Sequence, residues 1–188
     1  MYKRRINMPD ASVDAFLANF QGGGARPNRY EVILTFPTLV TNPEATRKAS
    51  FTCKAASLPA SNMGSVDVPY MGRSIKVAGD KTFDDWSVTI INDTDFSVRD
   101  TFERWVDRIL GHVSNYAANG WENPNNYYAN AIVRQFGRES NKVLKEYEIS
   151  GMFPTQVGEI SLGYDSNDSV EEFGVTFAIN YWKSSTTT

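Results

Sequence analysis

Alternation of apolar and polar residues with a period of two is the pattern that most constrains this chain. It is strongest in EEFGVTFAINYW (171–182), where every second residue from Phe173 to Tyr181 is large and apolar. Side chains of a β-strand point alternately to its two faces, so this segment predicts a strand with one buried face. Weaker segments of the same kind predict further strands at 30–36, 51–55, 86–91, 131–137, 142–150 and 159–165.

One segment follows helical spacing instead. Between Ser97 and Leu110 the apolar residues recur every three or four positions, and charged residues fill the remaining surface. This predicts one amphipathic helix, with Ser97 and Asp100 as a capping pair and Gly111 as the stop. The pattern as a whole predicts a mainly β protein, an antiparallel β-sandwich or partly open barrel with one packed α-helix.

The chain of 188 residues is long enough for one domain, which we place at 29–182. Before it, residues 1–28 form an expected flexible arm with a short amphipathic stretch followed by glycines. After it, residues 183–188 are an expected polar tail. Within the domain, the polar segments 37–50 and 112–128 are expected to be projecting or exposed loops.

Composition narrows the possible functions. There are 19 basic and 22 acidic residues, a balance that argues against a dedicated nucleic-acid-binding protein. No apolar run approaches the roughly 20 residues that span a bilayer, so no membrane partner is expected. One cysteine and one histidine are too few for a disulfide framework or a zinc site, and no metal or cofactor is expected.

Catalytic residues are not evident. His112 follows the predicted helix end, where a cation-capable group favours the helix dipole, so a capping or surface role is expected. Cys53 alternates with Phe51 and Ala55 on an apolar face, which is typical of a small buried hydrophobe. The sequence therefore shows no evident catalytic arrangement.

The acidic segment VAGDKTFDDW (77–86) offers the remaining candidates for chemistry. Asp84 and Asp85 are adjacent, so in an extended chain they point to opposite sides and cannot easily share a proton or a metal ion. Aspartate and glycine in such a run favour a turn. The residues expected to order this turn, with a tryptophan anchoring the next strand, are Gly79, Asp80, Lys81, Asp84, Asp85 and Trp86.

The longer segment VAGDKTFDDWSVTIIND (77–93) resembles the tail tube proteins of contractile-tailed, T4-like bacteriophages. The resemblance extends, in the order and spacing of that family, over most of residues 25–182. The further segments that carry it are ARPNRYEV, FTCKAASLPAS, PYMGRSIKVAGD, AIVRQFGRES, KEYEISGMFPTQVGEISLGYDSND and FGVTFAINYW.

The resemblance implies a structural subunit of the virion, assembled in the host cytoplasm, that forms hexameric rings. It also implies that the protein is not an enzyme, which agrees with the absence of an evident catalytic arrangement. The rings would stack into a tube inside a contractile sheath, and DNA would pass through the tube without specific binding. The implied partners are further copies of the chain, the sheath protein, and the baseplate, tail-terminator and tape-measure proteins. A single ring at the tail terminus or baseplate, and the tube of a contractile injection or secretion system, are the alternatives.

Under this resemblance the turn at 77–86 is a candidate joint between subunits. Glu146, Glu148 and Glu159 occupy the polar faces of two predicted strands and are candidates for the lumen lining. Arg99, Glu103 and Arg104 lie on the charged side of the predicted helix and are candidates for sheath contact.

Two functions of other classes remain open at the level of sequence. A small hydrolase could use Asp84 or Asp85 together with His112, and it requires a concave pocket that brings them together. A carbohydrate-binding sandwich could use Trp121, Tyr127 and Tyr128, provided that these rings are exposed.

Overall fold

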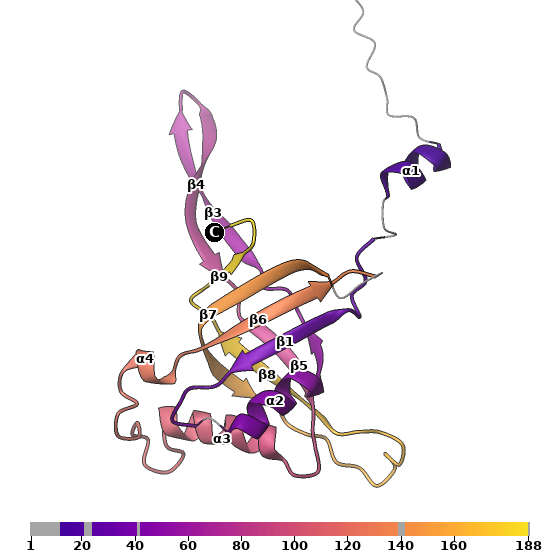
Figure 1. Ribbon diagram of the computed structural model, residues 1–188. Coiled ribbons are helices and arrows are strands. Elements are labelled where there is room, and N and C mark those ends of the chain that lie inside the picture. Colours follow the sequence, from indigo (N-terminus) through magenta and orange to yellow (C-terminus); the bar gives the residue numbers. More distant parts are fainter. Residues whose placement is uncertain (1–11, 21–23, 41, 139–141, 188) are drawn as a thin grey trace, which may run out of the picture.

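The alternating segments pair into one antiparallel sheet in the computed structural model, which describes residues 12–20, 24–40, 42–138 and 142–187 (Figure 1). Within these residues the sheet has seven strands, in the order β1-β6-β7-β8-β5-β2, and β9 also pairs with β7. Its strands are β1 (Tyr30–Thr35), β2 (Cys53–Ala56), β5 (Trp86–Ile91), β6 (Ala129–Phe136), β7 (Val143–Val157), β8 (Glu172–Ala178) and β9 (Tyr181–Ser184). The prediction of a mainly β, antiparallel fold is confirmed.

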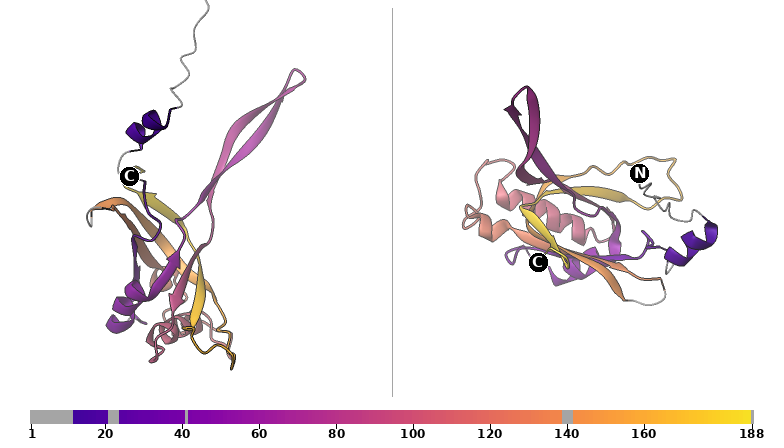
Figure 2. Two further views of the ribbon diagram at one scale, coloured as in Figure 1. Left: turned by 90° about the vertical axis from the view of Figure 1, so that its right-hand side faces the viewer. Right: turned by 90° about the horizontal axis from the view of Figure 1, so that it is seen from above.

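The long strand β7 joins the two halves of this sheet. Its first part pairs with β6 and β9, and its last part pairs with β8. Gly151 lies between the two parts with φ of +65°, and a Cβ there would meet the Asn180 amide nitrogen at 2.3 Å. This left-handed, crowded position favours glycine, and β7 changes its partner strand just after it, so that the sheet wraps around its own core (Figure 2).

The core lies on the inner face of the wrapped sheet and is covered by the helix α3 (Ser97–Ile109). Val98, Phe102 and Trp105 of α3 are buried, as the helical spacing predicts. The Trp86 ring stacks on Phe177 at 5.6 Å, and the predicted anchoring role of Trp86 is supported by its full burial. The other buried side chains of the strongest alternating segment are Phe173 and Val175.

The start of α3 differs from the expectation. The N-cap is Phe96, in a left-handed conformation with φ of 52°, and its own side chain makes no capping hydrogen bond. Ser97 is already helical and its hydroxyl has no hydrogen-bond partner, so the predicted Ser97–Asp100 capping pair is wrong. Asp95 instead accepts a hydrogen bond from the Ser97 amide at 3.2 Å.

The segment expected to be a projecting loop at 37–50 contains a second packed helix, α2 (Pro43–Thr52). Asn42 caps it by accepting a hydrogen bond from the Glu44 amide, and proline occupies its first turn. Its buried residues are alanines, which allow close packing against β1 and α3. Phe51 belongs to this helix and is exposed, so the predicted strand at 51–55 is reduced to the short β2.

Three further expectations are corrected. Residues 159–165 form no strand, because the alternating Leu162 and Tyr164 find no partner and stay exposed. The predicted strand at 171–182 breaks after Ala178 into β8 and β9. Trp121 is only 3% exposed, so it cannot serve the carbohydrate-binding alternative as an open ring.

The ends of the chain carry one further helix. The amphipathic stretch in the arm forms α1 (Val13–Asn19), whereas residues 1–11 and 21–23 lie outside the described residues, so the flexibility of the arm stays a prediction. Lys183 and Ser184, expected in the tail, pair with β7 as part of β9. In the described part of the chain no helix is long and apolar enough to cross a membrane.

Candidate assembly interface

The second sheet of the molecule is a two-stranded hairpin that leaves the body. Strands β3 (Ser61–Tyr70) and β4 (Arg73–Phe83) pair with each other along their length (Figures 1 and 2). Every residue of β3 is exposed, and in β4 only Gly79 and Phe83 are half-buried. We call this element the projecting hairpin. A lone hairpin is at best marginally stable in water, so this one is suited to being covered by another chain.

The tip of the projecting hairpin is a tight turn at Met71 and Gly72. Both residues have positive φ, 46° and 79°, as a two-residue turn of this kind demands. Asparagine or aspartate normally takes the first position, and methionine there is strained. Met71 is nevertheless 86% exposed, which places an apolar side chain at the far end of the molecule.

The outer part of the projecting hairpin has one apolar face. In the antiparallel register Val66 lies opposite Val77, and Val68 lies opposite Ile75. Directly opposed residues share a face, so these four side chains and Tyr70 form one exposed surface, which we call the hairpin apolar face. Arg73, opposite Tyr70, bounds this face at the tip. The other face is polar and includes the ion pair between Asp67 and Lys76 at 3.3 Å.

The segment 77–86 is not the turn that its composition predicts. Gly79, Asp80 and Lys81 lie inside β4, and only Asp84 and Asp85 form a connection, between β4 and β5. The glycine has a steric reason, since Gly64 and Gly79 face each other at a bulge where an added Cβ would come within 3.2 Å of the opposite backbone. Sequence alone could not separate a bulge from a turn, because both favour glycine.

The base of the projecting hairpin is held to β9. The Trp182 indole nitrogen donates a hydrogen bond to the Ala60 carbonyl at 3.0 Å, and the Phe83 ring lies 6.3 Å from the Trp182 ring. The Lys81 ammonium lies over both rings, at 5.2 and 5.8 Å. The Asn62 amide donates to Asp84 at 2.6 Å. Asp84 thus fixes the joint between hairpin and body.

A second candidate surface is the outward side of β1, β6, β7 and β9. Cross-strand register aligns its residues, and we call this set the charged sheet face: Glu31, Ile33, Ile132, Arg134, Glu146, Glu148 and Lys183. Arg134 lies 2.6 Å from Glu146 and 3.6 Å from Glu31, and the bond to Glu146 raises the pKa of Arg134. Three carboxylates and two cations leave this face with one net negative charge.

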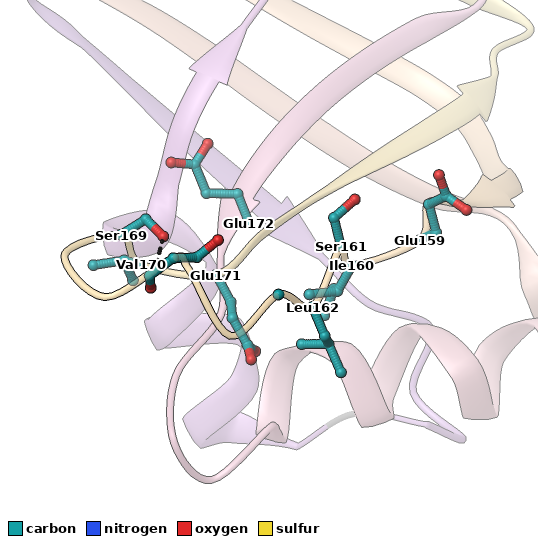
Figure 3. Close-up of a pocket in the computed structure, with 10 residues that line it drawn as sticks. Glu159, Ile160, Ser161, Leu162, Ser169, Val170, Glu171 and Glu172 are labelled. Atoms are coloured by element: carbon teal, nitrogen blue, oxygen red, sulfur yellow. Dashed lines mark hydrogen bonds between the residues drawn. The ribbon is translucent and has the colours of Figure 1, made fainter.

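Glu159 is not part of the charged sheet face. It lies in the loop between β7 and β8, at the rim of a shallow surface cavity of about 370 Å³ (Figure 3). Figure 3 shows the side chains of Glu159, Glu171 and Glu172 pointing away from one another. Glu172 is paired with Lys54 and Glu171 accepts a hydrogen bond from Asn92. The three carboxylates therefore form no acid pair and no ligand set.

The charged side of α3 is exposed in part. Glu103 and Arg104 are exposed, whereas Arg99 is held inward: its guanidinium donates to the Gly158 carbonyl at 3.1 Å and lies over the Phe173 ring. Arg99 also pairs with Glu103 at 2.8 Å. Of the three candidates for sheath contact, Arg99 is thus largely committed to the subunit.

The groups considered for chemistry occupy structural positions. Burial raises the pKa of the Cys53 thiol to about 11, so it is protonated and unreactive at neutral pH. His112 is exposed, and its ring nitrogen lies 2.9 Å from Asp107, whose pKa this contact lowers. Asp84 and Asp85 lie at the hairpin joint and not beside His112. Among the described residues no group of three potential metal ligands comes together.

Comparison with known proteins identifies the fold. Residues 25–185 match the family model of the phage tail tube protein. The chain belongs to the phage tail tube protein family. It is 40% identical over 172 residues to tail tube protein gp19 of Enterobacteria phage T4, a match that covers 91% of this chain and 99% of the relative. It is 28% identical to the tail tube protein of Serratia phage KSP90, over 87% and 91% of the two chains.

Solved structures of contractile systems share the fold of this tail tube protein. A chain of the anti-feeding prophage baseplate superposes with a TM-score of 0.61 at 12% identity, covering 86% of this chain and 95% of the other. A chain of the sheath-tube complex of an extracellular contractile injection system superposes with a TM-score of 0.58, also at 12% identity, over 89% and 95%. These structures share the fold alone; the family match and the 40% identical relative make the chain a structural subunit of a phage tail tube and a component of the virion.

The sequence did not reveal the projecting hairpin as an element. Its first signal was the short alternation of Val66, Val68 and Tyr70, between prolines and glycines that favour loops. Met71-Gly72 was the second available signal, because a glycine after a strand-like run suits a hairpin tip.

Proposed function

We propose that this tail tube protein assembles into hexameric rings that stack into a hollow tube, the conduit for genome ejection. The observation that carries this proposal is the projecting hairpin, whose apolar side chains are exposed in the single subunit. Exposed apolar faces of this kind mark protein–protein contacts. The relatives named as tail tube proteins, and the six-fold baseplate to which one structural neighbour belongs, support assembly around a ring.

The sheet offers edges for ring closure. Within the described residues β1 pairs only with β6, and β2 pairs only with β5. Unpaired strand edges favour pairing with another chain, and joining them around a ring closes the subunit sheets into one continuous barrel. We therefore place the contacts between copies of one ring at the two ends of the strand order.

The charged sheet face is our candidate for the channel wall. It places Glu146 and Glu148 toward the lumen and leaves Glu159, which lies on a loop, out of that wall. A basic lining would hold DNA through its phosphates, whereas a face with one net negative charge per subunit releases it. The positive charge of Arg134 partly neutralises the charges of Glu31 and Glu146. Repulsion between the carboxylates of this face is therefore reduced.

The remaining surfaces suit the other partners of a contractile tail. We assign the hairpin joint, from Gly79 to Trp86, to contacts between subunits, because Lys81 and Asp84 fix the angle of the projecting hairpin there. Glu103 and Arg104 of α3 suit the sheath protein, with Arg99 acting through Glu103. Baseplate, terminator and tape-measure proteins would contact the ends and interior of the tube. We propose no catalytic activity for the chain.

Electron microscopy of the purified protein tests this proposal. Concentrated alone or with baseplates, the protein is expected to form stacked six-fold rings of uniform width. Single rings that never stack would instead indicate a terminus or baseplate component. A protein that stays monomeric even with baseplates present would contradict the tube assignment.

A further inference from the structure

The arm helix α1 is a second apolar surface that the single subunit leaves uncovered. Val13, Phe16, Leu17 and Phe20 lie on one side of it at helical spacing and are 46–72% exposed. None of the residues of α1 is buried. A helix of seven residues is too short to be stable by itself in water, so its stability depends on packing against another surface.

The hairpin apolar face matches this helix in length and chemistry. Seven helical residues span about 10 Å. From Val66 to Tyr70 the hairpin apolar face extends about 13 Å, at 3.3 Å per strand residue. Val66, Val68, Ile75 and Val77 are branched and 44–54% exposed, a ridged surface on which the Phe16 and Leu17 side chains can pack. Each surface is therefore an exposed apolar face that the other could cover.

Chain topology separates the two surfaces within one copy. The arm enters the fold at β1, which is one end of the strand order, while the projecting hairpin lies in the chain between β2 and β5 at the other end. Figure 1 shows α1 and the projecting hairpin on opposite sides of the body and extending from the same end of it. In a ring, the β1 side of one copy faces the β2–β5 side of the next, which brings the two surfaces together.

We propose that α1 of one copy packs on the hairpin apolar face of the neighbouring copy in the ring. This contact rests on the proposed ring assembly and names what covers the projecting hairpin there. The chain between Phe20 and Tyr30 can span at most about 35 Å when extended, so the arm can cross a subunit boundary but cannot reach a distant copy. Exchange of such an arm fastens each subunit to the next around the ring.

Cysteine cross-linking between two populations of full-length chain tests the contact. One population carries Leu17→Cys and the other, with a distinguishable tag, carries Val68→Cys. They are mixed, assembled as the wild type is, and oxidised. The expected product is a disulfide-linked dimer that contains both tags, and neither population alone gives a dimer. Val13→Cys, on the same side of α1, serves as a second helix position.

The native protein supplies the background control, because Cys53 is buried and its thiol is protonated at neutral pH. A matched position control is Val113→Cys, fully exposed in the loop after α3 and expected to give no link with Leu17→Cys. A chain carrying both Leu17→Cys and Val68→Cys separates a contact between copies from a contact within one copy. Disulfides between copies support the proposed contact, and a disulfide confined to one chain overturns it.

Electron microscopy of the same samples separates the two proposals. Rings with the mixed-tag link support both. Rings without any link from either helix position overturn the arm contact and leave the tube assignment intact. Absence of rings together with absence of the link contradicts the proposed assembly and the contact that rests on it.

Discussion

At the scale of single residues, Gly158 is a position where a neighbouring backbone leaves no room for a side chain. Its amide donates a hydrogen bond to the Gly174 carbonyl at 2.7 Å, and a Cβ on Gly158 would lie 2.8 Å from the same oxygen. Gly158→Ala therefore forces the backbone of β8 to move and disturbs the bond from Arg99 to the Gly158 carbonyl. We expect a loss of about 1–3 kcal/mol in the free energy of unfolding, measured by urea denaturation of dissociated subunits.

Gly163→Ala is the matched control for this change. The nearest atom to its added Cβ is the Ser166 hydroxyl at 3.5 Å, an ordinary van der Waals contact. We expect the unfolding free energy of this variant to stay within about 0.5 kcal/mol of the wild type. Equal stability of the two variants would contradict this, because it would mean that the β8 backbone moves away from the added Cβ at no cost in free energy.

At the scale of elements, α2 is fastened to the loop before α3 by one lysine. The Lys48 ammonium donates to Asp93 at 2.8 Å and also to Asp95, and these hydrogen bonds lower the pKa of both carboxyls. A carboxyl whose pKa is lower in the folded state stabilises the fold above its unfolded pKa, near 3.9, and loses that contribution as pH falls through its folded pKa.

We therefore expect Lys48→Gln to be less stable than the wild type at pH 5 to 7 and to approach it below about pH 3. Thermal unfolding of both proteins across this pH range measures the difference in stability between them. Effects of the other carboxyl groups cancel in this difference, because both proteins contain them. Arg47→Gln is the control, because its ion pair with Glu44 is exposed on both sides and contributes little. A gap between Lys48→Gln and wild type that is constant with pH would argue against this linkage.

At this scale, the sequence predicted those elements that bury a regular face of large apolar residues in the core. Strands β1, β5 and β8 bury one face in the core, and their period of two was sufficient to find them. Helix α2 was missed because its buried residues are alanines, although Asn42 followed by Pro43 was an available start signal. The alternation at 159–165 misled because periodicity cannot show whether a partner strand exists.

The candidate surfaces were harder to predict than the core. The shared face of Glu146 and Glu148 follows from strand alternation alone, and the structure bears out that both lie on the charged sheet face. The partner Arg134 required the register between β6 and β7, which depends on bulges near both strand ends. The hairpin apolar face has no contact with the core, so nothing in the subunit itself marks those residues as important.

At the scale of the whole molecule, the charged sheet face decides what the proposed tube can conduct. Glu148 is the informative position, because it is exposed and its reversal leaves the Glu31–Arg134–Glu146 network in place. Glu148→Lys adds two units of positive charge per subunit, repeated in every ring. A basic wall binds the DNA phosphates, and this binding weakens steeply as the salt concentration rises.

We expect phage built with Glu148→Lys to assemble normal tails and to contract, but to release DNA more slowly, with the rate recovering at higher salt. Triggered DNA release measured in vitro, with tails inspected by electron microscopy, provides both readouts. Glu122→Lys makes the same charge reversal in an exposed loop away from this sheet and is expected to leave release unchanged. Normal release from intact Glu148→Lys tails at low salt would place the charged sheet face outside the channel, because a cation repeated in every copy along the wall of the proposed tube would slow the passage of DNA.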